Sequence, residues 1–87
     1  MSDVTVERNA GAHRFEIHIE GRVAFLTYEE RDDEIVLLHT EVPKELGGRG
    51  LGGTLAKEAL QWARAQHGKR LVVLCPFLRE YMHKHPE

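Results

Sequence analysis

The sequence predicts an α+β fold in which helices cover a mixed, mostly antiparallel sheet. Residues up to 42 alternate apolar and polar side chains with the period of β-strands, whereas residues after 51 follow the period of a helix. A glycine-rich loop separates these two parts, and a short apolar segment and a second, shorter helical segment complete the chain. Because 87 residues suffice for one modest core and not for two, we expect a single domain over residues 1–87.

The N-terminal half reads as short strands joined by turns. Four segments have the alternation or the apolar composition of strands: residues 4–8, 15–19, 23–28 and 35–42. The first is short and is expected at or near an edge of the sheet. Glu20-Gly21 is typical of a tight hairpin, the charged residues 29–34 form a solvated turn, and Pro43 ends the fourth strand. Strands with such short connections form an antiparallel meander.

The period changes after the glycine loop. Apolar residues recur at helical spacing from Leu51 onward, and Gly68 is a natural helix stop. Residues 71–75 are wholly apolar, so we expect a short strand inside the sheet, ended by Pro76. Residues 77–85 then predict the second, shorter helix.

Composition excludes several classes of protein. A formal net charge of −2 argues against a general binder of nucleic acid or membrane surfaces. The single cysteine, Cys75, excludes an internal disulfide framework and fits a reducing compartment. Apolar runs are too short to span a membrane, and the first residues do not have the pattern of a signal peptide. We therefore expect a cytoplasmic protein.

The glycine-rich loop is the most informative segment, because five of the seven residues 47–53 are glycine. It lies at the entrance to a helix, where unpaired N–H groups and the positive end of the helix dipole favour an anion such as a phosphate. Arg49 adds a positive charge. A Walker loop is excluded because no lysine precedes Thr54, and a Rossmann fingerprint fits poorly because the loop lies past mid-chain. A connector that binds no ligand is the remaining alternative.

The order of these elements resembles the GNAT acetyltransferase superfamily, and more specifically its minimal group of short members. The motifs that carry the resemblance are His39-Thr-Glu-Val-Pro43, Gly50-Leu51-Gly52 and Leu74-Cys-Pro-Phe77, the last followed by Lys84-His-Pro-Glu87. In that superfamily a loop with the pattern Q/R-x-x-G-x-G/A holds the pyrophosphate of acetyl-coenzyme A. Here its glycines are Gly50 and Gly52, the Q/R position falls on Gly47, and Arg49 lies two residues further on.

The resemblance implies acetyl-CoA as the cosubstrate, bound without a metal. Its pantetheine arm is expected between the strand of residues 35–42 and that of residues 71–75, with its amides extending the strand ladder. The residues expected to contact it are Val42, Gly47, Gly48, Arg49, Gly50, Leu51, Gly52, Gly53 and Thr54. No metal is expected, because Cys75 and the histidines of the last helix lack the spacing of metal ligands.

Three residues are candidates for the chemistry. His39 and Glu41 are two apart on one strand, so a regular strand points both to one face, where either can remove a proton from an amine. A bulge between them would break this shared facing. Cys75 is a candidate acyl-accepting nucleophile near the place where the thioester is expected. The alternatives are a packing role for His39, a solvated strand end for Glu41 and an inert buried thiol for Cys75.

The leading hypothesis is an acetyl-CoA-dependent N-acyltransferase that acts on an amine, by direct attack or through an acyl-cysteine at Cys75. So short a chain leaves few residues to enclose an acceptor, so the acceptor is expected to be a protein or peptide amine at an open site, or one bound with the help of a second subunit. A monomer and a homodimer are both compatible with the sequence. The alternatives are a coenzyme A-binding module without catalysis and a nucleotide binder anchored by its phosphates.

Overall fold

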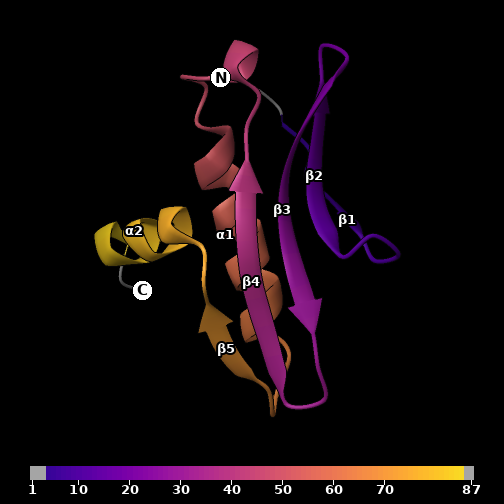
Figure 1. The fold of residues 1–87 in the computed structure, drawn as a ribbon, viewed down its shortest axis with the longest axis vertical. Helices are drawn as coiled ribbons and strands as arrows, with labels where there is room; N and C mark the ends of the chain where they lie inside the picture. Colours follow the sequence, from indigo (N-terminus) through magenta and orange to yellow (C-terminus); the bar gives the residue numbers. More distant parts are fainter. Residues whose placement is uncertain (1–3, 86–87) are drawn as a thin grey trace.

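Five strands lie side by side in the order in which they follow one another along the chain (Figure 1). This computed structural model describes residues 4–85, and its strands are β1 (Glu7–Asn9), β2 (Arg14–Ile19), β3 (Arg22–Glu30), β4 (Glu34–Glu41) and β5 (Arg70–Val73). Strands β1 to β4 pair antiparallel, and β5 runs parallel to β4. The mixed, mostly antiparallel sheet predicted from the sequence is thus confirmed.

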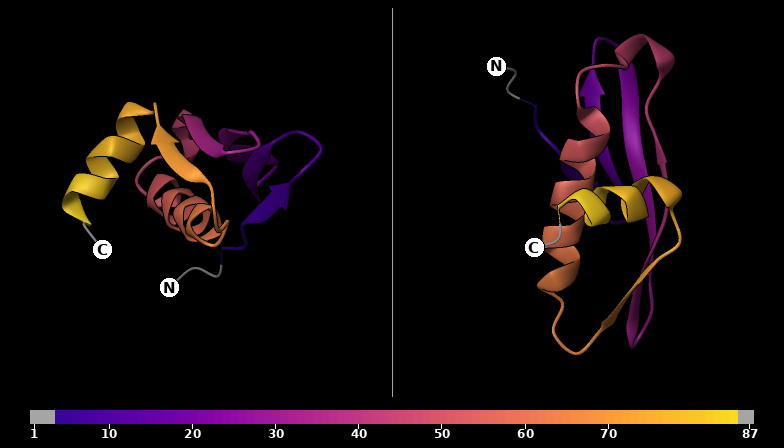
Figure 2. Two further views of the ribbon diagram at one scale, coloured as in Figure 1. Left: turned by 90° about the horizontal axis from the view of Figure 1, so that it is seen from below. Right: turned by 90° about the vertical axis from the view of Figure 1, so that its left-hand side faces the viewer.

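The helical elements follow β4 and β5. They are the 3-10 turn η1 (Lys44–Leu46), the long helix α1 (Leu51–Arg64) and the shorter helix α2 (Pro76–Lys84). Helix α1 packs on β2 and β3, while α2 contacts β4 and α1. Figure 2 shows α1 running along the sheet and α2 crossing its direction. No helix within residues 4–85 covers the opposite face of the sheet, and we call this face the open face. None of the described helices has the length and apolar character needed to cross a membrane.

The hairpin between β2 and β3 has the predicted turn. Glu20 and Gly21 both have positive φ, at 53° and 74°, which defines the type I′ geometry that suits the twist of a hairpin. The first strand differs from its prediction. It begins at Glu7 and continues to Asn9, one residue past the predicted end, while residues 4–6 lie outside the ladder. Val4 and Val6 pack against the core, so their alternation reflects side-chain burial rather than strand pairing.

The core lies between α1 and the face of the sheet that it covers. Alternate residues of β2, β3 and β4 meet one stripe of α1 there, and the most completely buried are Ile17, Leu26, Ile35, Leu37 and Leu55. Trp62 packs on this side, with its ring centroid 4.8 Å from that of Tyr28 and 5.6 Å from that of Phe15. The guanidinium of Arg8 lies 4.9 Å above the Trp62 ring and donates a hydrogen bond of 2.9 Å to the Tyr28 hydroxyl.

Strand β5 corrects one expectation. Its apolar run predicted a strand inside the sheet, but among the described strands β5 lies at the edge, beside β4 alone. Its residues 71–73 are only half-buried, and the next residue, Leu74, is 55 % exposed. An apolar run indicates contact with neighbours on both faces, and does not tell whether a second strand lies alongside.

Candidate functional site

Strands β4 and β5 separate halfway along β4. Their pairing ends at Leu37 and Val73, and the last hydrogen bond runs from the N–H of Leu74 to the carbonyl of Leu37, at 2.9 Å. Beyond this point β4 continues to Glu41, whereas the segment that follows β5 leaves the sheet and enters α2. Within the described residues, the second half of β4 therefore has an unpaired edge, and such an edge can accept an extended ligand.

A β-bulge marks the point of separation. Tyr28 lies opposite Leu37 and Thr27 lies opposite His39, so Leu38 is an extra residue in β4. Its side chain is 39 % exposed. The bulge precedes His39, so the strand from there to Glu41 is regular.

His39 and Glu41 share a face, as the sequence predicted. The Nε2 atom of His39 lies 2.9 Å from Oε1 of Glu41, and their side chains are 60 % and 58 % exposed. Their strand partners are Thr27 and Phe25, whose intervening neighbour Leu26 is buried on the covered face. The pair therefore lies on the open face, beside the separation of β4 and β5, where it can accept a proton from a group that approaches from solvent.

Cys75 lies on the other side of β4. It caps the N-terminus of α2, is 2 % exposed, and has its Sγ 3.5 Å from the hydroxyl oxygen of Thr40. Thr40 is opposite the buried Leu26, so this contact belongs to the covered face. In the part of the chain that the structure describes, neither His39 nor any other histidine forms a hydrogen bond with the thiol. The structure thus brings His39 and Glu41 together and places Cys75, the third predicted catalytic residue, on the other face of the sheet.

The glycine loop presents free donors at the entrance to α1. Gly48 and Gly50 have φ of 82° and 75°, a conformation that favours glycine, and Gly50 caps the helix. The N–H groups of residues 48–53 have no acceptor among residues 4–85. These donors lie at the positive end of the helix dipole, which is the arrangement that binds phosphate.

Two of the predicted cofactor residues have packing roles that the sequence did not reveal. A Cβ at position 52 would lie 2.8 Å from Cζ of Phe77, and one at position 53 would lie 3.7 Å from Cε2 of Tyr81. Glycine at these positions allows α2 to approach α1. The hydroxyl of Thr54 donates to the carbonyl of Gly50 at 3.1 Å. The conformations of Gly48 and Gly50 therefore account for the free donors, and Gly52 and Gly53 account for the contact between helices.

Arg49 is engaged in an ion pair that the sequence did not predict. Its Nη1 and Nη2 atoms donate to the two carboxylate oxygens of Glu20, at 2.8 Å and 3.1 Å. This hydrogen bonding lowers the pKa of Glu20 and raises the pKa of Arg49. The two residues are 29 positions apart, and no local sequence pattern indicates their pairing.

A pocket of about 290 Å³ lies between the two helices. It is lined by Lys57, Leu60, Gln61, Arg64, Tyr81 and His85. The rings of Tyr81 and His85 are stacked, with centroids 4.4 Å apart. Lys57 and Arg64 form no ion pair with a described residue, so their charges are available to a ligand. Lys57 lies one turn beyond Gly53 on α1, so the pocket begins one helical turn from the glycine loop.

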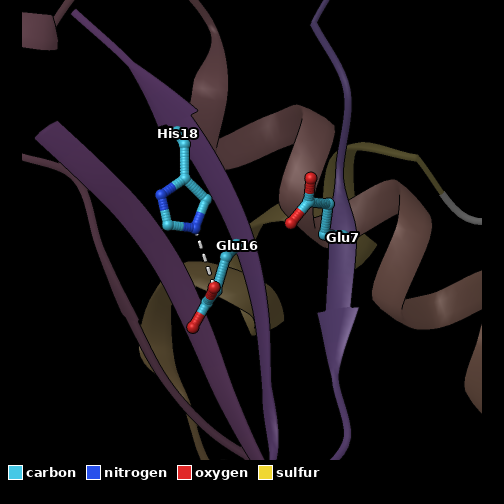
Figure 3. Close-up of side chains that lie close together, drawn as sticks. All are labelled: Glu7, Glu16 and His18. Carbon is cyan, nitrogen blue, oxygen red and sulfur yellow. Dashed lines mark hydrogen bonds and ion pairs between the residues drawn. The ribbon is translucent and has the colours of Figure 1, made fainter. Parts of the chain in front are cut away.

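A separate cluster of titratable groups lies on the open face at β1 and β2 (Figure 3). Glu16 is 5 % exposed and accepts hydrogen bonds from His18 at 2.8 Å, from Arg14 at 2.7 and 2.9 Å, and from Asn9 at 3.2 Å. The hydrogen bond from His18, followed by that from Arg14, lowers the pKa of Glu16 from 4.5 to about 2. The spacing Arg14-x-Glu16-x-His18 puts these residues on one face and was the available signal for this network.

The same cluster includes the residue types of a metal site. Glu7 lies directly opposite Glu16, and one ligand atom from each of Glu7, Glu16 and His18 lies within 4.8 Å of the others. Both carboxylate oxygens of Glu16 already accept hydrogen bonds, and a cation would have to displace Arg14. The cluster is therefore an ion-pair network that compensates a buried carboxylate.

A mixed sheet whose parallel strands separate beside a glycine-rich helix entrance is the architecture implied by the motifs of an acetyltransferase domain. Residues 14–87 match the family model described as GCN5-related N-acetyl-transferase, so the chain belongs to this family. The chain is also similar to Protein NATD1 of Bos taurus. The two are 33 % identical over 86 residues, which cover 95 % of this chain and 75 % of that protein.

Proposed function

We propose that this protein is an acetyl-CoA-dependent N-acyltransferase that transfers an acetyl group directly to an amine. One observation carries the proposal. The unpaired half of β4 leads directly into the connection to α1, and the free N–H groups of residues 48–53 lie at the end of that connection. A phosphate site therefore adjoins an open strand edge. A ligand with a pyrophosphate at one end and an extended, amide-bearing arm matches both features.

The residues present fit the parts of acetyl-CoA. The amides of residues 48–53 would bind the pyrophosphate, and the free edge of β4 as far as Val42 would pair with the amides of the pantetheine arm. The pocket between α1 and α2 would take the nucleoside end, where Lys57 and Arg64 offer positive charge to its phosphate. Tyr81 offers a ring on which a base can stack.

Acetyl-CoA supplies the acyl group as an activated thioester. The acceptor must reach the acyl carbon as a neutral amine, and Glu41, hydrogen-bonded to His39, is placed to take the proton from its ammonium form. The amine nitrogen then bonds to the acyl carbon as the carbon–sulfur bond breaks, and the proton that the nitrogen loses on becoming an amide passes, through solvent, to the departing sulfur. Because the pair lies on the open face, the acceptor would approach from the side opposite α1, which suits a protein or peptide amine.

Direct transfer is favoured over an acyl-cysteine intermediate. The Cys75 side chain is 2 % exposed, and its hydrogen-bond partner is the hydroxyl of Thr40 rather than a base. A thiol becomes a nucleophile most readily beside a base, and the side chain that is hydrogen-bonded to Cys75 in the described chain is a hydroxyl. We therefore expect a Cys75→Ala variant to retain turnover.

The first experiment is a calorimetric titration of the wild-type protein with acetyl-CoA, beside Gly50→Val and Gly68→Val variants. Both glycines have left-handed φ, at 75° and 85°, so both substitutions strain the backbone in the same way. Gly68 follows the far end of α1, so it is the matched control. Micromolar binding that is lost only in Gly50→Val supports the cofactor site. Failure of the wild-type protein to bind at millimolar acetyl-CoA contradicts it.

Turnover is tested next by thiol release in the presence of lysine-containing peptides. We expect Glu41→Gln and His39→Ala to lower the rate by about 10²-fold while acetyl-CoA affinity is unchanged, because proton transfer and not binding is removed. Loss of turnover in Cys75→Ala alone would point instead to the acyl-cysteine route.

A coenzyme A-binding module without catalysis is the second candidate. It is favoured by Gly47 at the Q/R position of the loop motif and by the pairing of Arg49 with Glu20. It predicts that acetyl-CoA binds but that no amine is acetylated at any pH, and the two experiments above separate it from the enzyme.

A further inference from the structure

Arg49 occupies a special position in the glycine loop. The chain reads Gly-Gly-Arg-Gly between the buried residues Leu46 and Leu51, so Arg49 carries the one side chain beyond a hydrogen atom in residues 47–50. Glycine loses more conformational freedom on ordering than any other residue. Among residues 47–50, Arg49 therefore has the one side chain that can hold the loop, in addition to the backbone bonds of Gly47 and Gly50.

The β2–β3 hairpin holds this side chain at two points. The two Nη atoms of Arg49 bond to the two carboxylate oxygens of Glu20, and such a two-point contact fixes orientation as well as distance. Glu20 is at the turn of the hairpin, in a left-handed conformation that residues with a Cβ seldom adopt. The turn thus presents a carboxylate where glycine or asparagine is more usual.

A second ion pair of opposite polarity joins the same two segments. Arg22 at the start of β3 lies 3.4 Å from Glu45 in η1, so the hairpin and the connection from η1 through the glycine loop each contribute one acid and one base. Figure 1 shows the tip of the hairpin and the loop at the same end of the molecule. Single exposed ion pairs contribute little, but two pairs that join the same segments restrict their relative position.

The side chain of Arg49 points away from the open edge of β4. In the sheet order, the hairpin lies on one side of β4 and β5 lies on the other. The guanidinium is thus drawn toward the hairpin, away from the place where β4 and β5 separate. The N–H groups of residues 48–53 stay without a protein acceptor in the described chain, and they can bind a phosphate without the guanidinium.

We propose that Glu20 and Arg49 form a clamp that holds the glycine loop in the conformation that presents its N–H groups. Arg49 is then a positioning residue of the cofactor site and not a ligand of the phosphate. The inference rests on the proposed function, because the clamp acts on acetyl-CoA affinity. A loop ordered in advance loses less freedom when the ligand binds, and its affinity is correspondingly higher.

A charge-reversal cycle tests the clamp. Glu20→Arg, Arg49→Glu and the double variant are titrated with acetyl-CoA at low ionic strength. We expect each single variant to bind about fivefold more weakly, the effect of losing a well-oriented exposed pair. The double variant restores the pair with its polarity exchanged, so its affinity is expected to return to within about twofold of the wild-type value.

The opposite result identifies Arg49 as a phosphate ligand. A glutamate at position 49 would then repel the phosphate whatever residue occupies position 20, and the double variant would bind as weakly as Arg49→Glu. In that case Glu20→Gln would also tighten binding, because it frees the guanidinium. Either outcome overturns the clamp.

The control is a matched pair at the other end of the sheet. Lys69 lies 3.1 Å from Glu30, and the variants Glu30→Lys and Lys69→Glu are expected to leave acetyl-CoA affinity unchanged. Hydrogen exchange in the unliganded protein gives a second measurement, read at the amides of Gly47 and Thr54, which are bonded to the carbonyls of Lys44 and Gly50 at the two ends of the loop. We expect faster exchange in each single Glu20 or Arg49 variant and slower exchange again in the double. If the wild-type protein does not bind acetyl-CoA, the proposed function fails, whereas unchanged exchange across the cycle overturns the clamp itself.

Discussion

The two faces of the sheet are built by different physical means. On the face covered by α1, residues such as Leu26, Leu37 and Leu55 are completely buried and apolar. On the open face, Val36 is buried, and so is a carboxylate, Glu16, which is kept from water by Arg14 and its neighbours. The covered face is stabilised by removal of apolar surface from water, whereas the open face also depends on the satisfaction of a buried charge.

The difference indicates which face can carry chemistry. A close-packed apolar face cannot change shape or charge without loss of stability. The open face is already polar, and it places the exposed pair of His39 and Glu41 next to the point where β4 and β5 separate. The candidate catalytic groups therefore lie where they contribute least to folding.

The largest expected effect is on the covered face. Leu26→Ala removes a side chain that is completely buried, and we expect it to lower the free energy of unfolding by about 3 kcal/mol, because it leaves a cavity. Chemical denaturation with constant m-value measures the change. The control is Phe25→Ala on the adjacent open-face position, where we expect about 1 kcal/mol. Equal losses would mean that the open face is buried in solution, as in a dimer.

The second effect concerns the charge on the open face. Glu16→Gln keeps the shape of the side chain and weakens its bonds to Arg14 and His18, so we expect a loss of about 2 kcal/mol at neutral pH. The control is Glu7→Gln directly opposite, which removes a like charge and should leave stability unchanged or slightly higher. A loss in Glu7→Gln as large as that in Glu16→Gln would contradict the network as described.

The pH dependence of stability follows from the same residue. The pKa of Glu16 is about 2 in the folded protein against an ordinary value of 4.5, because His18 and Arg14 donate hydrogen bonds to the carboxylate. A lowered pKa stabilises the folded state above the unfolded pKa, so this stabilisation is complete above about pH 4.5 and is lost as the pH falls toward 2. Thermal melts over this range should show a smaller pH dependence in Glu16→Gln than in the wild-type protein.

A smaller effect is expected at the margin of the covered side. The new Cβ of Gly52→Ala would lie 2.8 Å from Cζ of Phe77, but that ring is 44 % exposed and can turn toward solvent. We therefore expect a loss of less than about 1 kcal/mol, and Phe77→Ala in the same chain should remove most of it. A large loss that persists in the double variant would show that Gly52 is required for the conformation of the backbone and not for the approach of α2.

The sequence predicted those features that depend on near neighbours. Alternation identified β2 and β4, Glu20-Gly21 identified the hairpin, and the glycines identified the entrance to α1. Spacing alone placed His39 and Glu41 on one face. The roles of these residues in binding and catalysis stay predictions, because the fold determines where they lie and not what they do.

The features that the sequence did not predict depend on distant parts of the chain. The bulge at Leu38 depends on the register with β3, and the edge position of β5 depends on which strands meet it. The contact of Phe77 with Gly52 and the ion pair of Arg49 with Glu20 join residues that are far apart in sequence. Local periodicity carries no information on such pairings.

The smallest expected effect decides how the activity of variants is interpreted. His39 and Glu41 are each more than half exposed, and exposed ion pairs contribute about 0.2–1 kcal/mol. We expect His39→Ala and Glu41→Gln to change the free energy of unfolding by less than about 0.5 kcal/mol, measured by the same denaturation as Leu26→Ala. A loss of acetyl transfer in these variants then reflects proton transfer, because the folded population is unchanged. If these variants instead lose as much stability as Glu16→Gln, His39 and Glu41 stabilise the open face. A loss of acetyl transfer could then result from unfolding as well as from the loss of proton transfer.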